Sequence, residues 1–216
     1  MSIDGVLAAT LRDGAQKLGI VLSATQKDQL LNYLAMLAKW SRTYNLTSIR
    51  VPEQMMTHHL LDSLAAIPAF FGAKNVLDVG AGGGLPGMVL AIWGMSSQPD
   101  MRVSMIDTIH KKTAFLTQVK VEMGLKNVHI HTTRVEQLEV PHKFDVITSR
   151  AFANLSDFIN WSAHLLADDG QFIALKGMYP DYEMARLPSG WAVTQACPIA
   201  VPGLDAERYL IYIKRA

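Results

Sequence analysis

The stretch Asp78–Gly87, DVGAGGGLPG, places five glycines among ten residues directly after the run Asn75–Leu77. Each glycine inside a regular element costs about 0.5–1 kcal/mol relative to alanine, because its unfolded backbone loses more freedom. A bend this rich in glycine therefore needs a reason. Its place between a strand-like run and the helical pattern after Pro86 predicts a strand–loop–helix unit whose bare backbone passes close to a ligand. A tight turn without any ligand is the alternative.

From residue 74 onward, short apolar runs alternate with longer helical patterns. The strand-like runs are Asn75–Val79, Arg102–Ile106, Val128–Thr132, Phe144–Thr148 and Gln171–Leu175. The helical segments expected between them are Pro86–Gly94, Lys111–Gly124, Arg134–Leu138 and Asn154–Leu166. This alternation predicts an α/β fold with a mostly parallel sheet and helices on both faces. Two last runs, Trp191–Cys197 and Arg208–Lys214, lack a long helix between them and predict an antiparallel hairpin.

The first 70 residues have a helical pattern. Ser23–Gln26 fits a capping box, and the leucines that follow recur at helical spacing. A second helix is predicted from Pro52 through Ala66. We expect residues 1–72 to form an N-terminal helical cap and residues 73–216 a Rossmann-like domain, packed together as one compact unit.

Composition restricts the class of protein. The 216 residues carry 20 Lys+Arg and 19 Asp+Glu, a formal charge of +1, which argues against a histone-like nucleic-acid binder but leaves room for a local basic rim. Cys197 is the only cysteine, so we expect no disulfide and no cysteine-based metal site. No apolar run reaches the length of about 18 residues that a membrane span needs, and the N-terminus lacks a secretory pattern. These features predict a cytoplasmic protein.

The glycine loop fits a nucleotide-type cofactor. Gly82, Gly84 and Gly87 formally satisfy the dinucleotide pattern G-x-G-x-x-G, which is weak by itself. Asp78, inside the strand, favours S-adenosylmethionine (AdoMet) instead, because its carboxylate can face an ammonium group or orient loop amides. Asp107, at the end of the second strand, is predicted to bind a ribose diol, with a helix N-cap as the alternative.

Later strand ends complete the predicted pocket. Val135 and Glu136 follow the third strand and offer a backbone amide and a carboxylate to an adenine edge; an ordinary helix start is the alternative. Arg150 follows the fourth strand and suits a carboxylate or phosphate. Phe152 either stacks on a flipped base or belongs to the core. His59 is interpreted as a structural hydrogen-bonding residue rather than a metal ligand, and we expect no metal. The cations that we consider for RNA are Arg42, Arg50, Lys111, Lys112, Arg150 and Lys176.

Five blocks occur together in one order, and their combination is specific. They are Tyr44–Ser48 (YNLTS), His59–Ser63 (HLLDS), Asp78–Gly87, Ser149–Ala153 (SRAFA) and Leu175–Gly177 (LKG). With them, the chain closely resembles the glucose-inhibited division protein B family from about Gln26 to Lys214. These are the AdoMet-dependent guanine-N7 methyltransferases of bacterial small-subunit ribosomal RNA. The glycine loop alone would indicate only a class I methyltransferase.

The resemblance implies transfer of a methyl group from AdoMet to N7 of one guanine of 16S rRNA near the decoding site, guanine 527 in the family's rRNA numbering. It also implies a seven-stranded class I methyltransferase fold. By position, Gly80, Leu85, Val135, Glu136 and Arg150 match the family's cofactor contacts. Many relatives carry Thr-Gly-Pro-Gly or Thr-Gly-Ala-Gly where this chain has Ala-Gly-Gly-Gly, a change that loosens the loop but blocks nothing.

The residues suit N7 chemistry. Guanine N7 has a free lone pair and no proton, so alignment matters more than a general base, and no catalytic residue is certain; the candidates are Arg150, Phe152 and Lys176. Exocyclic-amine enzymes carry [DN]-P-P-[YF] where this chain has Ser149–Phe152, and cytosine-C5 enzymes need a cysteine nucleophile, whereas Cys197 lies in the hairpin, where we expect a buried small residue. An NAD(P)-dependent oxidoreductase and a non-catalytic RNA-binding assembly factor stay open. We expect a monomer acting on rRNA within the small ribosomal subunit or its precursor.

Overall fold

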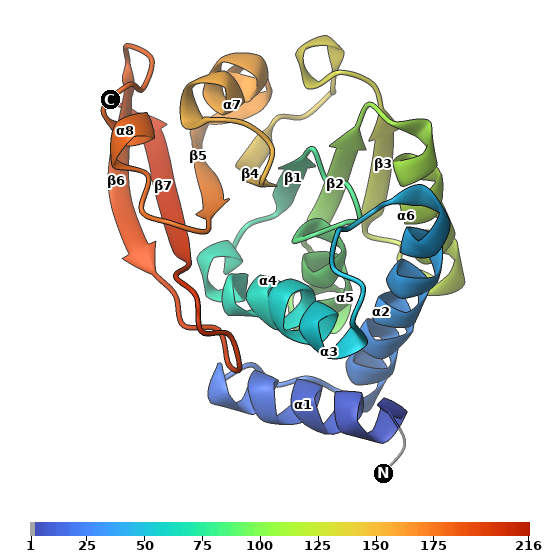
Figure 1. Ribbon diagram of the computed structural model, residues 1–216. Helices are drawn as coiled ribbons and strands as arrows, with labels where there is room; N and C mark the ends of the chain where they lie inside the picture. The colour runs from blue at the N-terminus through green and yellow to red at the C-terminus, as the bar shows by residue number, and fades with distance from the viewer. Residues whose placement is uncertain (1–2) are drawn as a thin grey trace.

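The computed structural model describes residues 3–216, which form a seven-stranded sheet with helices on both faces (Figure 1). The strands are β1 (Asn75–Val79), β2 (Arg102–Asp107), β3 (Val128–Thr132), β4 (Phe144–Arg150), β5 (Leu166–Lys176), β6 (Trp191–Pro198) and β7 (Tyr209–Arg215). Their order is β3-β2-β1-β4-β5-β7-β6. Neighbours from β3 to β5 are parallel, whereas β7 runs antiparallel to both β5 and β6. The predicted mostly parallel sheet with a C-terminal antiparallel hairpin is confirmed.

The longer helices are α1 (Ile3–Lys17), α2 (Ala24–Tyr44), α5 (Gly87–Ser97), α6 (His110–Glu122) and α7 (Leu155–Ser162). Shorter ones are α3 (Pro52–Met55), α4 (Asp62–Ala65) and α8 (Asp181–Met184). Single turns of other helix types are η1 (Met56–Leu61), η2 (Ile67–Phe70), η3 (Val135–Gln137) and η4 (Ala163–Leu165). The predicted capping box at the start of α2 is present in full, with Ser23 and Gln26 bonded to each other's backbone. None of the helices within residues 3–216 is long and apolar enough to cross a bilayer.

Three predicted helices differ from the structure. The helix predicted over Asn154–Leu166 ends as α7 at Ser162, and the 3₁₀ turn η4 and the start of β5 take up the remaining residues. The segment predicted as a helix over 134–138 is only the 3₁₀ turn η3, because so few residues do not offset the cost of nucleating an α-helix. The helix predicted from Pro52 through Ala66 contains the π-helical turn η1 between α3 and α4. π-turns inside helices often occur at functional sites, and η1 carries His58 and His59.

The sheet buries a different set of side chains on each face. Val76 and Val103 belong to a buried cluster that also holds residues of α2, α4, α5 and α6, whereas Leu77 and Ile106 pack with α7. The period of two along a strand explains this division. Because the first cluster includes cap residues such as Leu30, the cap and the sheet share one core. A boundary at residue 72 stays a prediction, and the first two residues of the proposed cap lie outside the described residues.

Candidate active site

A cleft lies at the carboxyl ends of the parallel strands, where the order of the sheet reverses between β1 and β4. It consists of two adjoining cavities of about 530 and 480 Å³ that share Gly80, Lys112 and Ala151. We call the first the cap-side cavity, because residues of α2, of the loop after it and of η1 form one wall. The second, the β2–β3 cavity, is bounded by the residues that follow β2 and β3.

The glycine loop after β1 forms the floor between the cavities, and fixed hydrogen bonds hold it. The Gly82 amide donates to Asp107 Oδ2 at 3.1 Å, and the Gly83 carbonyl accepts from the buried Tyr33 hydroxyl of α2 at 2.6 Å. At Gly82 the backbone has φ +55°, and an added Cβ would meet open space apart from the Gly80 carbonyl oxygen at 3.8 Å. Glycine adopts this left-handed φ without strain, and the open space at the Cβ position lets a ligand approach the backbone closely.

Gly83 has a different role from its neighbour. A Cβ there would lie 2.9 Å from Leu37 Cδ1, on the same face of α2 as Tyr33. The absent side chain therefore lets the cap pack on the loop. The sequence interpretation treated Gly83 only as an extra glycine that loosens the loop, and the structure shows that its missing side chain makes room for the cap.

Asp78 lies completely buried beneath the loop and does not line either cavity. Its Oδ2 accepts from the Gly87 amide, the first residue of α5, at 2.8 Å. Its Oδ1 is buried without a hydrogen-bond partner. Burial raises the pKa of Asp78 to about 7, against the opposing effects of the Gly87 hydrogen bond and of Arg150. An unpaired buried carboxylate oxygen is costly unless a ligand or ion satisfies it.

The β2–β3 cavity contains the predicted ribose and adenine residues. Asp107 is buried at the end of β2, where it also accepts from the Ile109 amide at 2.9 Å and pairs with Lys112 Nζ at 3.3 Å. Asp107 therefore accepts hydrogen bonds both from the residue that precedes α6 and from the glycine loop. Val135 and Glu136 of η3 line the opposite wall. These three residues come together because the ends of neighbouring parallel strands meet at one edge of the sheet.

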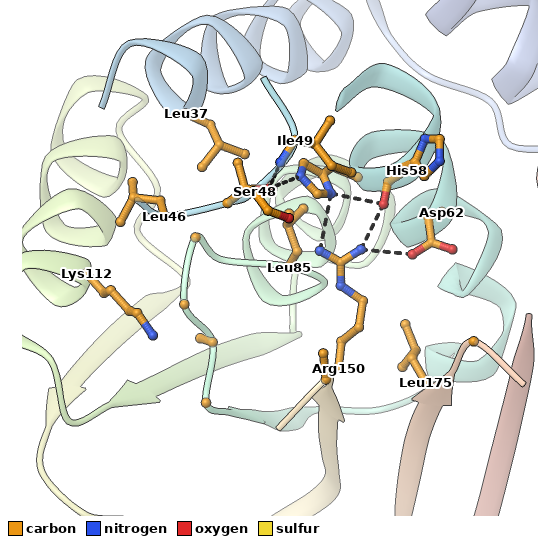
Figure 2. Close-up of a pocket in the computed structure, with 18 of the residues that line it drawn as sticks. Leu37, Leu46, Ser48, Ile49, His58, Asp62, Leu85, Lys112, Arg150 and Leu175 are labelled. Carbon is orange, nitrogen blue, oxygen red and sulfur yellow. Dashed lines mark hydrogen bonds and ion pairs between the residues drawn. The ribbon is translucent and has the colours of Figure 1, made fainter. Parts of the chain in front are cut away.

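In the cap-side cavity, a buried carboxylate joins two arginines. Asp62 accepts from Arg150 at 2.9 Å and from Arg208 at 2.8 Å, one on each oxygen, and its side chain is only 3% exposed. Arg150 also donates to the His58 carbonyl of η1 at 2.9 Å. Figure 2 shows the Arg150 guanidinium directed toward Asp62 and His58, with Lys112 on the other side of the cavity. This network ties the ends of β4 and the start of β7 to the cap.

His59 is a neutral structural residue, as the sequence predicted. Its Nδ1 lies 3.0 Å from the His58 carbonyl oxygen, which can only accept, and 3.5 Å from an Arg150 nitrogen, which can only donate; the shorter contact favours the proton on Nδ1. Nε2 then accepts from the Thr47 hydroxyl at 2.8 Å. Burial and the nearby Arg150 lower the pKa of His59 to about 4, so the ring stays uncharged near neutral pH. This contact fixes the loop after α2 against η1.

The three catalytic candidates do not share one cavity. Arg150 and Lys176 line the cap-side cavity, where Lys176 pairs with Glu183 at 2.7 Å. Phe152 lines the β2–β3 cavity, half-buried against Trp161 with ring centroids 5.7 Å apart. The intervening Ala151 has φ +54°, which turns the chain between the two cavities.

Charge differs between the two cavities. The cap-side cavity is lined by one carboxylate, that of Asp62, and by four cations: Lys112, Arg150, Lys176 and Arg208. The β2–β3 cavity has two cations, Lys112 and Arg134, against two carboxylates, Asp107 and Glu136. Because the whole chain has a formal charge of only +1, positive charge is concentrated at the cap-side cavity, where it suits an anionic ligand.

Some residues of the cleft were missed from the sequence, and some candidates lie elsewhere. Asp62, Arg208 and Tyr33 were given no role, although HLLDS already marked Asp62 as part of a block. Conversely, Arg42, Arg50 and Lys111 do not line either cavity. Cys197 is half-buried in β6 rather than fully buried, and it lines neither cavity. Among residues 3–216, no group of three or more His, Cys, Asp or Glu side chains is arranged to hold a metal ion.

Comparison with known sequences identifies close relatives. The family model described as GidB, rRNA small subunit methyltransferase G, matches residues 26–211. The ribosomal RNA small subunit methyltransferase G of Herminiimonas arsenicoxydans is 64% identical over 209 residues, which cover 97% of this chain and 96% of the relative. The protein of the same name from Chromobacterium violaceum is 51% identical, with 94% of this chain and 95% of the relative covered.

Solved structures agree on the fold. Magnesium protoporphyrin IX methyltransferase of Synechocystis PCC 6803, solved with bound SAM, superposes with a TM-score of 0.56 at 15% identity and covers 84% of this chain and 97% of its own. A ribosomal protein L11 methylase of Lactobacillus delbrueckii subsp. bulgaricus gives a TM-score of 0.55 at 20% identity and covers 76% of this chain and 79% of its own. The predicted class I methyltransferase fold is thereby confirmed.

Proposed function

The chain belongs to the rRNA small subunit methyltransferase G family, and we propose that it transfers a methyl group from AdoMet to N7 of guanine 527 of 16S rRNA, in the family's rRNA numbering. The observation that carries the proposal is the divided cleft. A charge-balanced β2–β3 cavity adjoins a cationic cap-side cavity, and the glycine loop lies between them. The nucleoside part of the donor suits the β2–β3 cavity, its methionine part would lie along the glycine loop, and a polyanionic acceptor suits the cap-side cavity.

The residues of the cleft fit AdoMet. Asp107 would accept from the ribose hydroxyls, and Val135 and Glu136 would read the adenine edge. Gly80, Gly82 and Leu85 would surround the methionine portion, and Arg150 its carboxylate. Gly84, also predicted to bind the donor, lines neither cavity, because its missing side chain faces Leu116 and Met88. Asp78 offers its unpaired Oδ1 to the positive end of the donor from beneath the loop. When bound, AdoMet supplies a methyl group carried on a positively charged sulfur.

The chain's own part in the reaction is alignment. Guanine N7 needs no base to remove a proton, so a fixed geometry supplies most of the acceleration. While one oxygen of Asp62 holds Arg150 toward the donor, Arg208, held by the other oxygen, would orient the phosphates or the base of the acceptor in the cap-side cavity. Lys176, held by Glu183, would do so from the other wall. Because Phe152 lines the β2–β3 cavity and not the cap-side cavity, its position favours packing against the donor over stacking on the target base.

The target guanine must be accessible. In folded RNA the deep groove hides the N7 edge, so the acceptor is an unstacked base. A near-neutral chain gains little from phosphate contacts alone, which favours an assembled small subunit or its precursor over naked rRNA. We infer that the protein acts there as a cytoplasmic monomer.

A methyl-transfer assay tests the proposal. Purified protein and methyl-labelled AdoMet would be incubated with small subunits, and with free 16S rRNA, from cells that lack the protein. We expect label at N7 of guanine 527, mapped by mass spectrometry of nuclease fragments, with subunits preferred. Label on another atom, or NAD binding in place of AdoMet, would overturn it. AdoMet binding without any label on either RNA form would instead indicate the assembly factor.

A further inference from the structure

Three of the large apolar side chains that the described surface exposes lie within five residues of one another, just beyond β5. Met178, Tyr179 and Tyr182 are 76%, 43% and 65% exposed. They directly follow Lys176 and Gly177, which line the cap-side cavity. Single exposed apolar residues are ordinary, whereas a cluster beside a cleft indicates a contact surface.

This segment is fixed before any partner arrives. Lys176 Nζ pairs with Glu183 of α8 at 2.7 Å, and Glu183 also accepts from the Leu155 amide at 2.7 Å. The Tyr179 ring meets Tyr209 of β7 edge-on, with centroids 5.2 Å apart. In Figure 1 the loop after β5 leads to α8 beside the C-terminal hairpin. Because the segment is preorganised, it loses little conformational entropy on binding.

Tyr182 and Arg186 form a planar, positively charged pair. The Arg186 guanidinium carbon lies 3.6 Å from the centroid of the Tyr182 ring and covers one face of it. The 65% exposure of Tyr182 leaves the rest of the ring open to solvent. Unpaired nucleobases stack on tyrosine rings and guanidinium planes, and the guanidinium also attracts phosphate.

We propose that Met178, Tyr179, Tyr182 and Arg186, called here the aromatic rim, stack on unpaired bases of the RNA next to the target nucleotide. This inference rests on the proposed function, because it takes RNA to enter the adjoining cap-side cavity. The charges nearby suit RNA. Of the two carboxylates of α8, Glu183 pairs with Lys176, so only Asp181 is exposed to solvent. The adjoining cap-side cavity is lined by four cations and one carboxylate, so cations outnumber carboxylates around the rim.

The test uses Tyr182→Ala, with Tyr182→Phe as the conservative variant. Val121→Ala is the matched surface control, because Val121 is 74% exposed on α6 and lines neither cavity. Affinity for unmodified 16S rRNA and for unmodified small subunits would be measured over a range of salt concentrations. AdoMet affinity and thermal unfolding would be measured alongside, to establish that each variant is folded and able to bind the donor.

Loss of one base stack weakens RNA binding by about 5- to 100-fold. We expect that loss for Tyr182→Ala, with an unchanged dependence of affinity on salt, since no phosphate contact is removed. Tyr182→Phe and Val121→Ala should bind RNA as the wild type does, and AdoMet affinity should not change. KM for small subunits should rise in Tyr182→Ala while kcat stays the same.

Two other outcomes separate this inference from the proposed function. Wild-type methyl transfer with unchanged RNA affinity and KM in Tyr182→Ala would overturn the aromatic rim and leave the function standing. A raised KM for subunits with unchanged affinity for naked rRNA would also overturn it, because the rim would then contact a ribosomal protein. Weakened RNA binding in Tyr182→Ala, with no methyl transfer by the wild type, would support the rim and overturn the function.

Discussion

The ionisation of Asp78 makes stability and donor binding depend on pH in opposite ways. Burial raises its pKa from the ordinary 3.8 to about 7. Between these values the unfolded chain has lost the proton that the folded chain keeps, so the contribution of Asp78 to stability falls as pH rises from about 4 to about 7. Asp78→Asn keeps an acceptor for the Gly87 amide without the charge. We expect it to raise the free energy of unfolding by about 1–3 kcal/mol at pH 8 and by little at pH 4.

AdoMet affinity should respond in the opposite sense. If Asp78 faces the donor's positive end, binding needs the carboxylate, and wild-type affinity should fall as pH drops below about 7. Asp78→Asn should bind AdoMet weakly at every pH. Denaturant titration and calorimetry at pH 4, 6 and 8 measure both effects. A variant that binds AdoMet as well as the wild type would remove Asp78 from the donor site.

The Tyr33 hydroxyl positions the glycine loop from the cap. It is buried and donates to the Gly83 carbonyl at 2.6 Å. Tyr33→Phe leaves that carbonyl unpaired, which costs about 1–3 kcal/mol. We expect AdoMet affinity to fall about 3- to 10-fold, measured by calorimetry, with KM for the RNA substrate unchanged. Tyr44→Phe at the end of the same helix is the control, and equal effects of both substitutions would contradict a specific role for Tyr33.

At the scale of elements, the contact between α2 and the loop after β1 is testable as a pair. A Cβ at Gly83 would meet Leu37 Cδ1 at 2.9 Å. Gly83→Ala should therefore destabilise the protein by about 1–3 kcal/mol through overpacking. Leu37→Ala creates space, so the double variant should lose less than the sum of the single losses. Chemical denaturation of all four proteins gives the interaction energy, and strict additivity would mean that the two residues do not contact.

Asp62 joins the end of β4 and the start of β7 to the cap through its two arginines. Asp62→Asn leaves Arg150 and Arg208 sharing a neutral amide. Removing one partner of a buried ion pair costs about 3–5 kcal/mol. Because both arginine side chains are 21% exposed, we expect about 2–3 kcal/mol in thermal or chemical unfolding. Ser63→Ala on the same turn is the control. A loss below about 0.5 kcal/mol would show that the arginines hold their positions without the carboxylate.

Strand periodicity made most of the sheet predictable. β1 and β3 have the predicted bounds, because β1 is a short apolar run and β3 alternates Val128 and Ile130 with histidines, each next to a clear turn or helix signal. β5 begins at Leu166 rather than Gln171, since Asp168 and Asp169 in its first half are exposed and interrupt the apolar pattern. The π-turn η1 gives no sequence signal, because its residues keep an ordinary helical pattern.

The candidate site was predictable where topology alone brings residues together. Asp107, Val135 and Glu136 follow neighbouring parallel strands, so their meeting is a consequence of strand order. The contact between Asp62 and Arg208 joins residues 146 positions apart, and it depends on how the cap packs against the hairpin. Neither spacing nor periodicity encodes such packing, and for the same reason the sequence assigned no role to Tyr33.

The whole molecule combines an almost neutral chain with one strongly cationic cavity. The formal charge of +1 alone would suggest little attraction to RNA. Four of the cations line the cap-side cavity, and all four are held there by Asp62, Glu183 or Asp107. The fold thus places charge where the proposed acceptor would enter, while the whole chain stays almost neutral, which limits non-specific binding to nucleic acid.

The cap and the sheet should unfold together, because one buried cluster contains residues of both. Trp40 in α2 and Trp191 in β6 are suited to report on the two parts. In each of two variants, one of these tryptophans would be retained and the others replaced by phenylalanine. Urea unfolding followed by fluorescence should coincide with unfolding followed by circular dichroism in both variants. If the Trp40 signal changed at lower urea than the circular dichroism, the cap would be a separate unit. The loop contacts of Tyr33 and Leu37 would then be lost before the sheet unfolds, and donor binding would disappear with the cap.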